Sequence, residues 1–550
     1  MKSSIKFLLL SSVMAGFTSA CTDLDINIDA QYTTYPDNPI ALSAKLEGCY
    51  YYLQNEAGLG RNYWEGVMLQ GDELMGICFN GGYYDNGRLF FPTTHDLKND
   101  TPGVGQMGDL MSGCSYCNSV IMELTGEAES EDPLIAPVRA IRAFYHFMMM
   151  DLYGDTPILS HSLQEGEVIN RSPRAEVAQW IEKELLAVIP QLTEENNANT
   201  YGRPNKWMAE ALLVKLYLNW GVYTCGDVKS VTVNTPNEKL NECIAWCDSI
   251  TDSGIFEVGK GYRQKFFPNN GVQIKDFIYA MNFDPVANPT KYIGGHQLDR
   301  FMTFKKANDC DNGPWGFKPS KSVAGAYVLV PECVERFNLP GDERNQMILG
   351  GPQYIFDYTN NYTLTDQPLM YQGQQVTYKQ LETSDFMDPT LLDVGADSEP
   401  SNIMKGYHLG KYPSIPDDFD LRDRVNGNDI PIFRYADILL TKAECILRGA
   451  NATRNDTPAS LINQVRDCSN APHIAEGDVT MQELLDERGR EFICEMWRRQ
   501  DLIRFGQFEN DWGWKHTIHP EAKTELWRRV MPIPLGVMET NTNWKQNEGY

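Results

Sequence analysis

A helical repeat of apolar side chains is the feature that most restricts how this chain can fold. Between Pro137 and Gly154, apolar residues recur at alternating steps of three and four, which places them on one face of an amphipathic helix. These residues are Val138, Ile141, Tyr145, Met148 and Leu152. Gly154 suits the end of this helix, because glycine adopts a left-handed C-cap conformation without steric cost.

The same period predicts further helices on both sides of an irregular middle region. They span residues 175–189, 205–223, 240–253, 434–448, 461–468 and 481–505. We therefore predict a mostly α fold built from stacked helix pairs. The helices are not identical repeats and a strict 34-residue period is absent, so the spacing alone gives only weak support for a solenoid.

The chain is expected to form one body with an inserted, loop-rich middle. Residues 255–430 are dense in Gly, Pro, Asn, Asp and Tyr, with short alternating runs that are typical of small β-hairpins. Because no flexible linker separates this part from its neighbours, we predict a single body over residues 40–550. Its parts are an N-terminal helical part (40–254), this ligand-facing part and a C-terminal helical part (431–550).

The first residues have the layout of a lipoprotein signal peptide. Two lysines come first, residues 7–17 are largely apolar, and small residues precede Cys21. We predict that residues 1–20 are removed, that acyl chains on Cys21 anchor the protein to a membrane, and that residues 21–39 form the lipidated tether. The alternatives are an ordinary signal peptide with a chance cysteine and a short core helix.

Charge excludes one class of partner. The 550 residues include 48 Lys and Arg against 74 Asp and Glu, a net charge of −26, and so acidic a surface repels a phosphate backbone. Nucleic acid is therefore not an expected partner. With 42% hydrophobic residues the chain can bury a large core, but its body contains no run of the roughly 18 apolar residues that a membrane-spanning helix requires.

Local motifs predict neither a cofactor nor a metal. Residues 103–108 match GxGxxG, but polar residues precede them where a nucleotide-binding fold needs an apolar strand. Cys114 and Cys117 have no second cysteine pair at ligand spacing. We assign no catalytic residue, and expect the acidic run at 486–491 to form a salt-bridged helix face. The paired carboxylates of a glycoside hydrolase can lie far apart in sequence, so that enzyme class stays an alternative.

Aromatic side chains in glycine-rich loops point to a carbohydrate ligand. Residues 79–88 combine aromatic rings, amides and an arginine, and residues 291–292 and 314–317 repeat the theme. A sugar ring stacks its CH face on Tyr or Trp, while its hydroxyls require planar donors and acceptors. The alternative is that these rings hold the loops to the core.

Several segments in a fixed order resemble the SusD/RagB family of outer-membrane nutrient-binding lipoproteins. They are residues 139–145 (RAIRAFY), 151–157 (DLYGDTP), 432–444 (IFRYADILLTKAE), 463–466 (NQVR), 483–491 (ELLDERGRE), 498–506 (RRQDLIRFG), 532–535 (PIPL) and 546–550 (QNEGY). The resemblance runs from the small residues before Cys21, which match a lipobox, to the last residue. It implies tetratricopeptide-like helix pairs that support a loop-rich ligand face. It also implies that Arg139, Arg434, Asp437 and Asp501 make internal ion pairs.

The resemblance further implies a role and a location. Members of the family sit on the exterior of the outer membrane as lids on a SusC-like TonB-dependent transporter, and they capture oligosaccharides for import. We therefore predict a noncatalytic, lipid-anchored protein that binds an oligosaccharide weakly, with dissociation constants of roughly micromolar to millimolar. The alternatives are peptide cargo in the same transport role, and a surface glycoside hydrolase.

The predicted ligand-binding residues combine both lines of argument. They are Asp72, Tyr83, Tyr84, Arg88, Tyr292 and Trp315. By resemblance, Trp315 corresponds to a stacking tryptophan. Residues 71–73 resemble an acidic turn near which a sugar-contacting Asp or Arg can lie, and Asp72 and Arg88 are the candidates. Because methionines stand where the family often has another ring, Tyr83 or Tyr84 is expected to supply the second platform.

Overall fold

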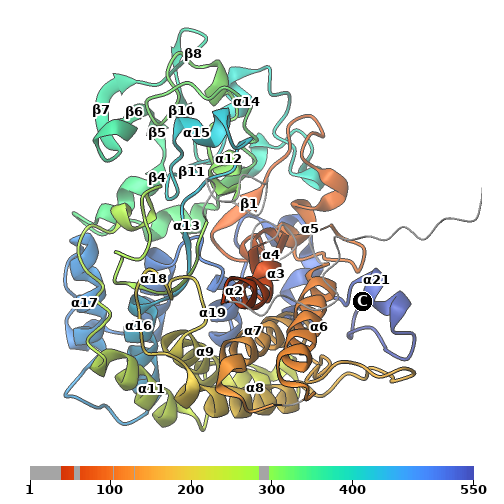
Figure 1. Ribbon diagram of the computed structural model, residues 1–550. Helices are drawn as coiled ribbons and strands as arrows, with labels where there is room; N and C mark the ends of the chain where they lie inside the picture. The colour runs from red at the N-terminus through yellow and green to blue at the C-terminus, as the bar shows by residue number, and fades with distance from the viewer. Residues whose placement is uncertain (1–38, 55–61, 103–104, 129, 284–295) are drawn as a thin grey trace, which may run out of the picture. The chain divides into compact units, whose positions relative to one another are not determined.

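The computed structural model describes residues 39–54, 62–102, 105–128, 130–283 and 296–550 (Figure 1). The chain divides into two compact units, Met1–Lys45 and Leu46–Tyr550. In the first unit, the described residues begin helix α2 (Pro39–Gly48). The second unit carries the remaining described helices and strands.

The described part of the chain is mostly helical, which confirms the predicted fold class. Its helices after α2 are α3 (Tyr51–Gln54), α4 (Asn62–Met68), α5 (Phe90–Thr94), α6 (Gln106–Thr125), α7 (Ala136–Tyr153), α8 (Arg174–Val188), α9 (Lys206–Leu218), α10 (Trp220–Thr224), α11 (Leu240–Asp252), α12 (Leu298–Met302), α13 (Pro331–Arg336), α14 (Pro400–Ile403), α15 (Pro416–Asp420), α16 (Tyr435–Leu447), α17 (Pro458–Ser469), α18 (Met481–Glu491), α19 (Arg498–Arg504), α20 (Lys515–Ile518) and α21 (Leu535–Thr540). Among the residues described, no helix has the length and apolar character needed to cross a bilayer.

Most strands of the short antiparallel pairs lie in the middle of the chain, where its composition predicts them, and the first strand comes from the N-terminal part. The pairs are β1 (Leu74–Gly76) with β3 (Tyr327–Leu329), β2 (Phe277–Met281) with β12 (Ile430–Arg434), β4 (Ile348–Leu349) with β11 (His408–Leu409), β5 (Gly351–Pro352) with β10 (Thr377–Tyr378), β6 (Tyr354–Asp357) with β7 (Thr363–Pro368), and β8 (Met370–Tyr371) with β9 (Gln374–Gln375). Within the second unit, Figure 1 shows most of these strands in the upper part and the long helices in the lower part.

Packing of helix against helix builds the core. The helix α7 packs between α6 and α8, and α11 packs against α9 and α16. The apolar stripe that predicts α7 is fully buried, and a proline in its first turn and Gly154 at its end (φ 74°) set its limits. The apolar face identified in the sequence is therefore the face around which this part of the core assembles.

Two predicted helices are interrupted in the structure. Residues 205–223 form α9 and α10, separated at Asn219, whose side chain donates to the Lys215 carbonyl and to Gln500. Residues 481–505 form α18 and α19, separated by a turn in which Cys494 (φ 61°) and Met496 (φ 52°) are left-handed. Both breaks depend on side-chain hydrogen bonds or left-handed turn residues, which the spacing of apolar residues cannot predict.

The turn between α18 and α19 serves a buried charge cluster centred on Arg434. The Arg434 guanidinium, 2% exposed, donates to the carboxylates of Asp276 (2.6 Å), Glu491 (2.7 Å) and Glu495 (2.8 Å). These carboxylates outweigh the effect of burial and raise the pKa of Arg434. Two cations join the cluster, since Lys265 pairs with Asp276 at 2.8 Å and Lys411 pairs with Glu495 at 2.5 Å. The cluster thereby ties β2, β12 and the end of α18 together.

A second buried network joins the helices α9, α16, α18 and α19. The Arg488 side chain pairs with Asp437 at 2.8 Å and with Asp501 at 2.7 Å, and Arg504 also pairs with Asp501 at 2.7 Å. On α7, Arg139 pairs with Glu184 of α8 at 2.8 Å. The prediction that Arg139, Arg434, Asp437 and Asp501 make internal ion pairs is therefore confirmed.

Replacing Arg434 with methionine should destabilise the protein strongly. The substitution keeps most of the side-chain volume but leaves three buried carboxylates without their shared cation, which we expect to cost about 3–5 kcal/mol of unfolding free energy. Urea unfolding at pH 7 measures this loss. The matched control is Lys275→Met, which removes an exposed pair with Glu257 and should change stability by less than about 1 kcal/mol. Equal losses in the two variants would contradict the assigned role of the cluster.

Candidate functional site

The loop of residues 79–88 leaves β1 and leads into α5, and its backbone is strained. Asn80 (φ 51°), Tyr83 (φ 69°), Asp85 (φ 46°) and Asn86 (φ 56°) all adopt left-handed conformations. Such conformations are uncommon for residues other than glycine and unusual for an aromatic residue. Asn and Asp tolerate this region better than other residues, so the cost, of order 1–3 kcal/mol, falls mainly on Tyr83, and such strain persists where the surrounding structure enforces it.

Asp393 enforces the shape of this loop. One carboxylate oxygen of Asp393 accepts hydrogen bonds from the backbone N–H groups of Asn80 (2.8 Å) and Gly395 (2.8 Å), and the other accepts from the Gly81 N–H (2.6 Å). The Asp393 side chain is itself buried. Hydrogen bonds to an ionised acceptor contribute more than neutral ones, so this clamp offsets part of the strain.

Tyr83 and Tyr84 are half-buried, and the clamp holds them on the same short loop. The Lys305 ammonium lies 4.1 Å from the centre of the Tyr83 ring, and the edge of Phe301 also packs on that ring. The Tyr84 ring packs against Phe90, with ring centres 6.0 Å apart. Supported in this way, both rings are held in place while part of each surface stays open to solvent.

Polar groups accompany the two rings. Asn80 and Asn86 are exposed on the same loop, and Lys305 shares the Asp397 carboxylate with Lys306, at 3.7 and 3.6 Å. Together with the tyrosines these side chains form what we call the tyrosine face: Asn80, Tyr83, Tyr84, Asn86, Lys305, Lys306 and Asp397. It offers ring surface, amides and charged donors, which is the chemistry that a sugar requires.

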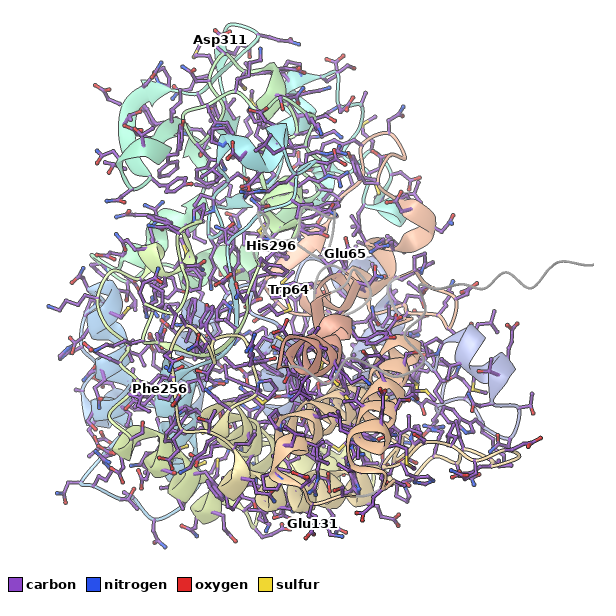
Figure 2. All side chains as sticks on the ribbon, in the orientation of Figure 1. Trp64, Glu65, Glu131, Phe256, His296 and Asp311 are labelled. Carbon is purple, nitrogen blue, oxygen red and sulfur yellow. The ribbon has the colours of Figure 1, made fainter. Side chains whose placement is uncertain are left out.

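Arg88 anchors the loop. Its guanidinium pairs with the Glu65 carboxylate and donates to the Asn62 side chain, and only 15% of its side chain is exposed. The buried Glu65, labelled in Figure 2, also accepts a hydrogen bond from the Tyr327 hydroxyl. Arg88 therefore fixes the end of the loop to α4, and its donors are largely occupied by protein partners.

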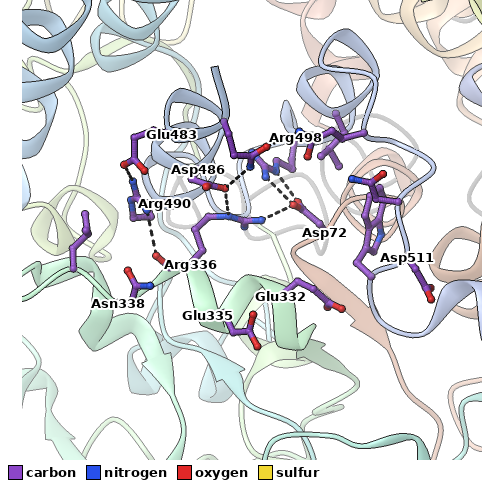
Figure 3. A pocket seen from close by; sticks show the side chains of 16 residues that line it. Asp72, Glu332, Glu335, Arg336, Asn338, Glu483, Asp486, Arg490, Arg498 and Asp511 are labelled. Atoms are coloured by element: carbon purple, nitrogen blue, oxygen red, sulfur yellow. Dashed lines mark hydrogen bonds and ion pairs between the residues drawn. The ribbon is translucent and has the colours of Figure 1, made fainter. Parts of the chain in front are cut away.

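Asp72 lies apart from the tyrosine face, in a cavity of about 450 Å³ (Figure 3). Its carboxylate pairs with Arg336 at 2.5 Å and with Arg498 at 2.6 Å. Burial acts to raise the pKa of Asp72, but the two arginines outweigh it and hold the pKa well below its usual range. The prediction that Asp72 contacts sugar does not agree with this placement, because its oxygens are committed to two buried cations.

The prediction that Trp315 stacks on sugar does not agree with its burial. Trp315 is 2% exposed, and its ring packs against Phe356 and Tyr362, with ring centres 5.4 and 5.9 Å apart. Its Nε1 donates to the Asp299 carboxylate at 3.1 Å. Here the alternative interpretation applies, since this ring holds its loop to the core.

Two predicted residues lie outside the described part of the chain: the lipidation site Cys21 and the ligand-binding candidate Tyr292. Of the other predicted ligand-binding residues, Tyr83, Tyr84 and Arg88 belong to the strained loop. Sequence reasoning missed Lys305 and Asp393, because each lies more than 200 positions from this loop in the printed sequence and no local motif links them.

Replacing Asp299 with asparagine should remove a pH-dependent destabilisation beneath Trp315. Burial raises the pKa of the Asp299 carboxyl to about 7, although Ser414 and Trp315 donate hydrogen bonds to it. An aspartate with a pKa raised above its unfolded value, about 4, loses stability as the pH rises from about 4 to 7. Across this window the wild-type protein should lose up to about 1.4 kcal/mol per pH unit relative to Asp299→Asn.

Urea unfolding of both proteins between pH 4.5 and 8 measures this difference. The exposed Asp420→Asn substitution is the control and should follow the wild-type profile. Parallel profiles for wild type and Asp299→Asn would show that the Asp299 carboxyl titrates alike in the folded and unfolded chain.

Solved structures share this fold. A laminarin-binding SusD-like protein superimposes with a TM-score of 0.67 at 17% identity, over 93% of this chain and 100% of that one. Surface glycan-binding protein A from Bacteroides thetaiotaomicron, in complex with laminarihexaose, superimposes with a TM-score of 0.66 at 18% identity, over 92% and 99% of the two chains. The helix-rich fold is therefore that of the SusD-like proteins.

Sequence comparison agrees with the fold. The SusD family model matches residues 311–550, and a second model, described as starch-binding and associating with the outer membrane, matches residues 114–218. The starch-binding protein SusD of Bacteroides thetaiotaomicron is 26% identical over 401 residues, which are 69% of this chain and 66% of that protein, just under two thirds of its length. The SusD-like protein P38 of Formosa agariphila is 21% identical over 91% of each chain. In sequence and in fold, the chain is therefore similar to the SusD/RagB family.

Proposed function

We propose that this protein is a noncatalytic binding protein that holds an oligosaccharide on the tyrosine face for import. The observation that carries the proposal is the pair Tyr83 and Tyr84 on a strained loop clamped by Asp393. Similarity to this family supports it, because structural neighbours with this fold bind laminarin and laminarihexaose.

The chemistry of the face suits a sugar ring. The CH side of a pyranose can pack on the exposed part of a tyrosine ring, where it loses contact with water. Exposed amides of Asn80 and Asn86 each supply a donor and an acceptor for hydroxyl groups, and the ammonium of Lys306 adds donors. Since such a face covers only one side of the ligand, single contacts contribute little and the affinity is weak.

The fixed shape of the loop favours binding by preorganisation. Ordering a flexible loop on binding would subtract from the affinity, whereas a loop already fixed by Asp393 and Arg88 does not incur that loss. Preorganisation for binding therefore explains why the loop keeps left-handed residues that lower the stability of the protein.

The proposal also includes a lipid anchor at Cys21 and a transporter as the partner. Acylation of Cys21 holds the protein on the exterior of the outer membrane, and the residues up to 39 act as a tether. The helical body docks on a SusC-like TonB-dependent transporter and delivers its ligand there. Support for this step comes from the family alone, since one of its models is described as associating with the outer membrane.

Replacing Tyr84 with alanine should weaken glycan binding without affecting the fold. Tyr84 has an ordinary backbone conformation (φ −67°), so the change removes ring surface without touching the strained positions. We expect a loss of about 1–2 kcal/mol, or roughly fivefold to thirtyfold in affinity. Tyr84→Phe should bind nearly as well as the wild type, and Leu421→Ala, at a residue 74% exposed elsewhere, should have no effect.

The measurement is titration calorimetry of the chain from residue 22 onward against starch and laminarin oligosaccharides, host glycans and peptide digests, with released ends assayed in parallel. Retention of a glycan without cleavage supports the proposal. Release of product that stops when one carboxylate is neutralised would show an enzyme, and selective retention of peptides would show the other cargo.

Replacing Asp393 with alanine tests the clamp separately. Both tyrosines remain, but the N–H groups of Asn80 and Gly81 lose their acceptor, and the loop can leave its strained conformation. We expect glycan affinity to fall at least fivefold and hydrogen exchange at residues 79–88 to rise, while exchange in α7 stays unchanged. Unaltered affinity would mean that the shape of this loop does not matter for binding.

A further inference from the structure

A second pocket, of about 580 Å³, lies beside the β6–β7 hairpin and shares no lining residue with the tyrosine face. In Figure 1 this hairpin lies at the upper left, whereas α5, which follows the tyrosine loop, lies at the right. The side chains that matter for its chemistry are Arg263, Gln264, Gln346, Tyr354, Asn361 and Leu364. They come from two 3-10 helices, Arg263–Phe266 and Glu343–Met347, and from the hairpin.

The charge of this pocket is unusual for so acidic a protein. None of the described residues that line it is an aspartate or glutamate, and Arg263 is the charged group among them. The cavity around Asp72 is the opposite case, because acidic side chains outnumber arginines in its lining (Figure 3). In a chain of net charge −26, a pocket with a cation and no acid is suited to an anion.

Arg263 is buried without the carboxylate partners that Arg344, Arg434 and Arg488 have. It is 8% exposed, its Nη1 donates to the Gln346 side chain at 3.1 Å, and its Nε has no hydrogen-bond partner. No carboxylate of the described residues lies within the 4 Å of an ion pair, and the charge of Glu343 acts on it only from farther away. By contrast, the fully buried Arg344 pairs with Asp342, Glu487 and Glu491.

The cost of this arrangement is visible in the electrostatics. Burial lowers the pKa of Arg263, whereas the surrounding carboxylates raise the pKa of Arg344 well above its ordinary value. An unpaired buried charge is destabilising, and a bound anion would relieve that cost. Among the described residues, the buried Nε of Arg263 has no hydrogen-bond partner and Nη1 donates to Gln346, so a bound carboxylate would meet the guanidinium on its Nη2 side.

The rest of the pocket suits a sugar. Tyr354 is 39% exposed and Leu364 is 53% exposed, so ring and aliphatic surface stand at the rim. Gln264, Gln346 and Asn361 are also exposed, and their amides can meet hydroxyl groups in either hydrogen-bonding role.

We propose that this pocket binds the carboxylate of a uronic acid unit in an oligosaccharide, with Arg263 as its ionic partner. The identity of the ligand as a sugar rests on the proposed function, but the site does not involve the tyrosine face. The pocket would give the protein a preference for acidic glycans and a second contact along the same chain of sugars.

The test compares two ligands with the same sugar backbone: a trimer of galacturonic acid, whose carboxylates are charged, and its fully methyl-esterified form, whose esters are neutral. Titration calorimetry of the chain from residue 22 onward should show the acid binding at least tenfold more tightly than the ester, with an affinity that falls as salt rises. Arg263→Gln should remove this preference, and Tyr354→Ala should weaken the acid at least threefold. A sulfated trimer of an otherwise neutral sugar, included as a further arm, should bind less tightly than the uronate.

Control variants separate this proposal from the previous one. Tyr84→Ala should leave binding of the acidic trimer unchanged, and Arg263→Gln should leave binding of a neutral glycan at the tyrosine face unchanged. Thermal unfolding checks the fold, and Arg263→Gln should melt no lower than wild type because it removes an unpaired charge. Equal binding of acid and ester, preference for the sulfated trimer, or acid binding that survives Arg263→Gln would each overturn the proposal. Failure of neutral glycans alone would count against the tyrosine face only.

Discussion

The buried cluster around Arg434 is the interaction on which the arrangement of the molecule depends. Its three carboxylates belong to two segments far apart in sequence: Asp276 precedes β2, whereas Glu491 ends α18 and Glu495 lies in the turn that follows. Any arrangement that separates these segments leaves a charge buried and unpaired, at a cost of several kcal/mol. The cluster therefore contributes less through net attraction than by disfavouring alternatives, and it fixes where the strand-rich middle joins the helices.

A scaffold held in this way can support strain elsewhere. The left-handed Tyr83 in the loop of residues 79–88 costs of order 1–3 kcal/mol, whereas the two hydrogen bonds from Asn80 and Gly81 to Asp393 contribute about 1.5–3 kcal/mol each. These hydrogen bonds offset the strain, so the shape of the loop depends on Asp393. Asp393 in turn depends on the bridge between its own backbone and Cys78, next to β1. Rigidity at the tyrosine face thus derives from the core rather than from the loop itself.

The sequence predicts those parts of the fold that follow from local periodicity. The apolar stripe of α7 and the limits of α8 and α16 agree with the structure within a residue or so, because a buried helix face repeats every 3.6 residues. Breaks at Asn219 and Cys494 are invisible to that period, since they depend on long-range partners. The site is predicted less well for the same reason: an aromatic residue in a polar loop can face solvent, as Tyr84 does in part, or plug the loop into the core, as Trp315 does. The choice depends on Asp299, Phe356 and Tyr362, which come from other segments.

The partners of the arginine side chains distinguish the scaffold from the binding surface more clearly than the aromatic rings do. Arg344, Arg434 and Arg488 are each surrounded by carboxylates that keep them charged and hold elements together. Arg88 has the same role at the end of the tyrosine loop. Arg263 has no such carboxylate, although 74 acidic residues in the chain could have supplied one. Aromatic rings appear in both settings and do not discriminate between them. A buried cation beside an open pocket does discriminate between them. Unless a ligand from outside the protein supplies the missing counter-charge, the buried cation lowers the stability of the fold.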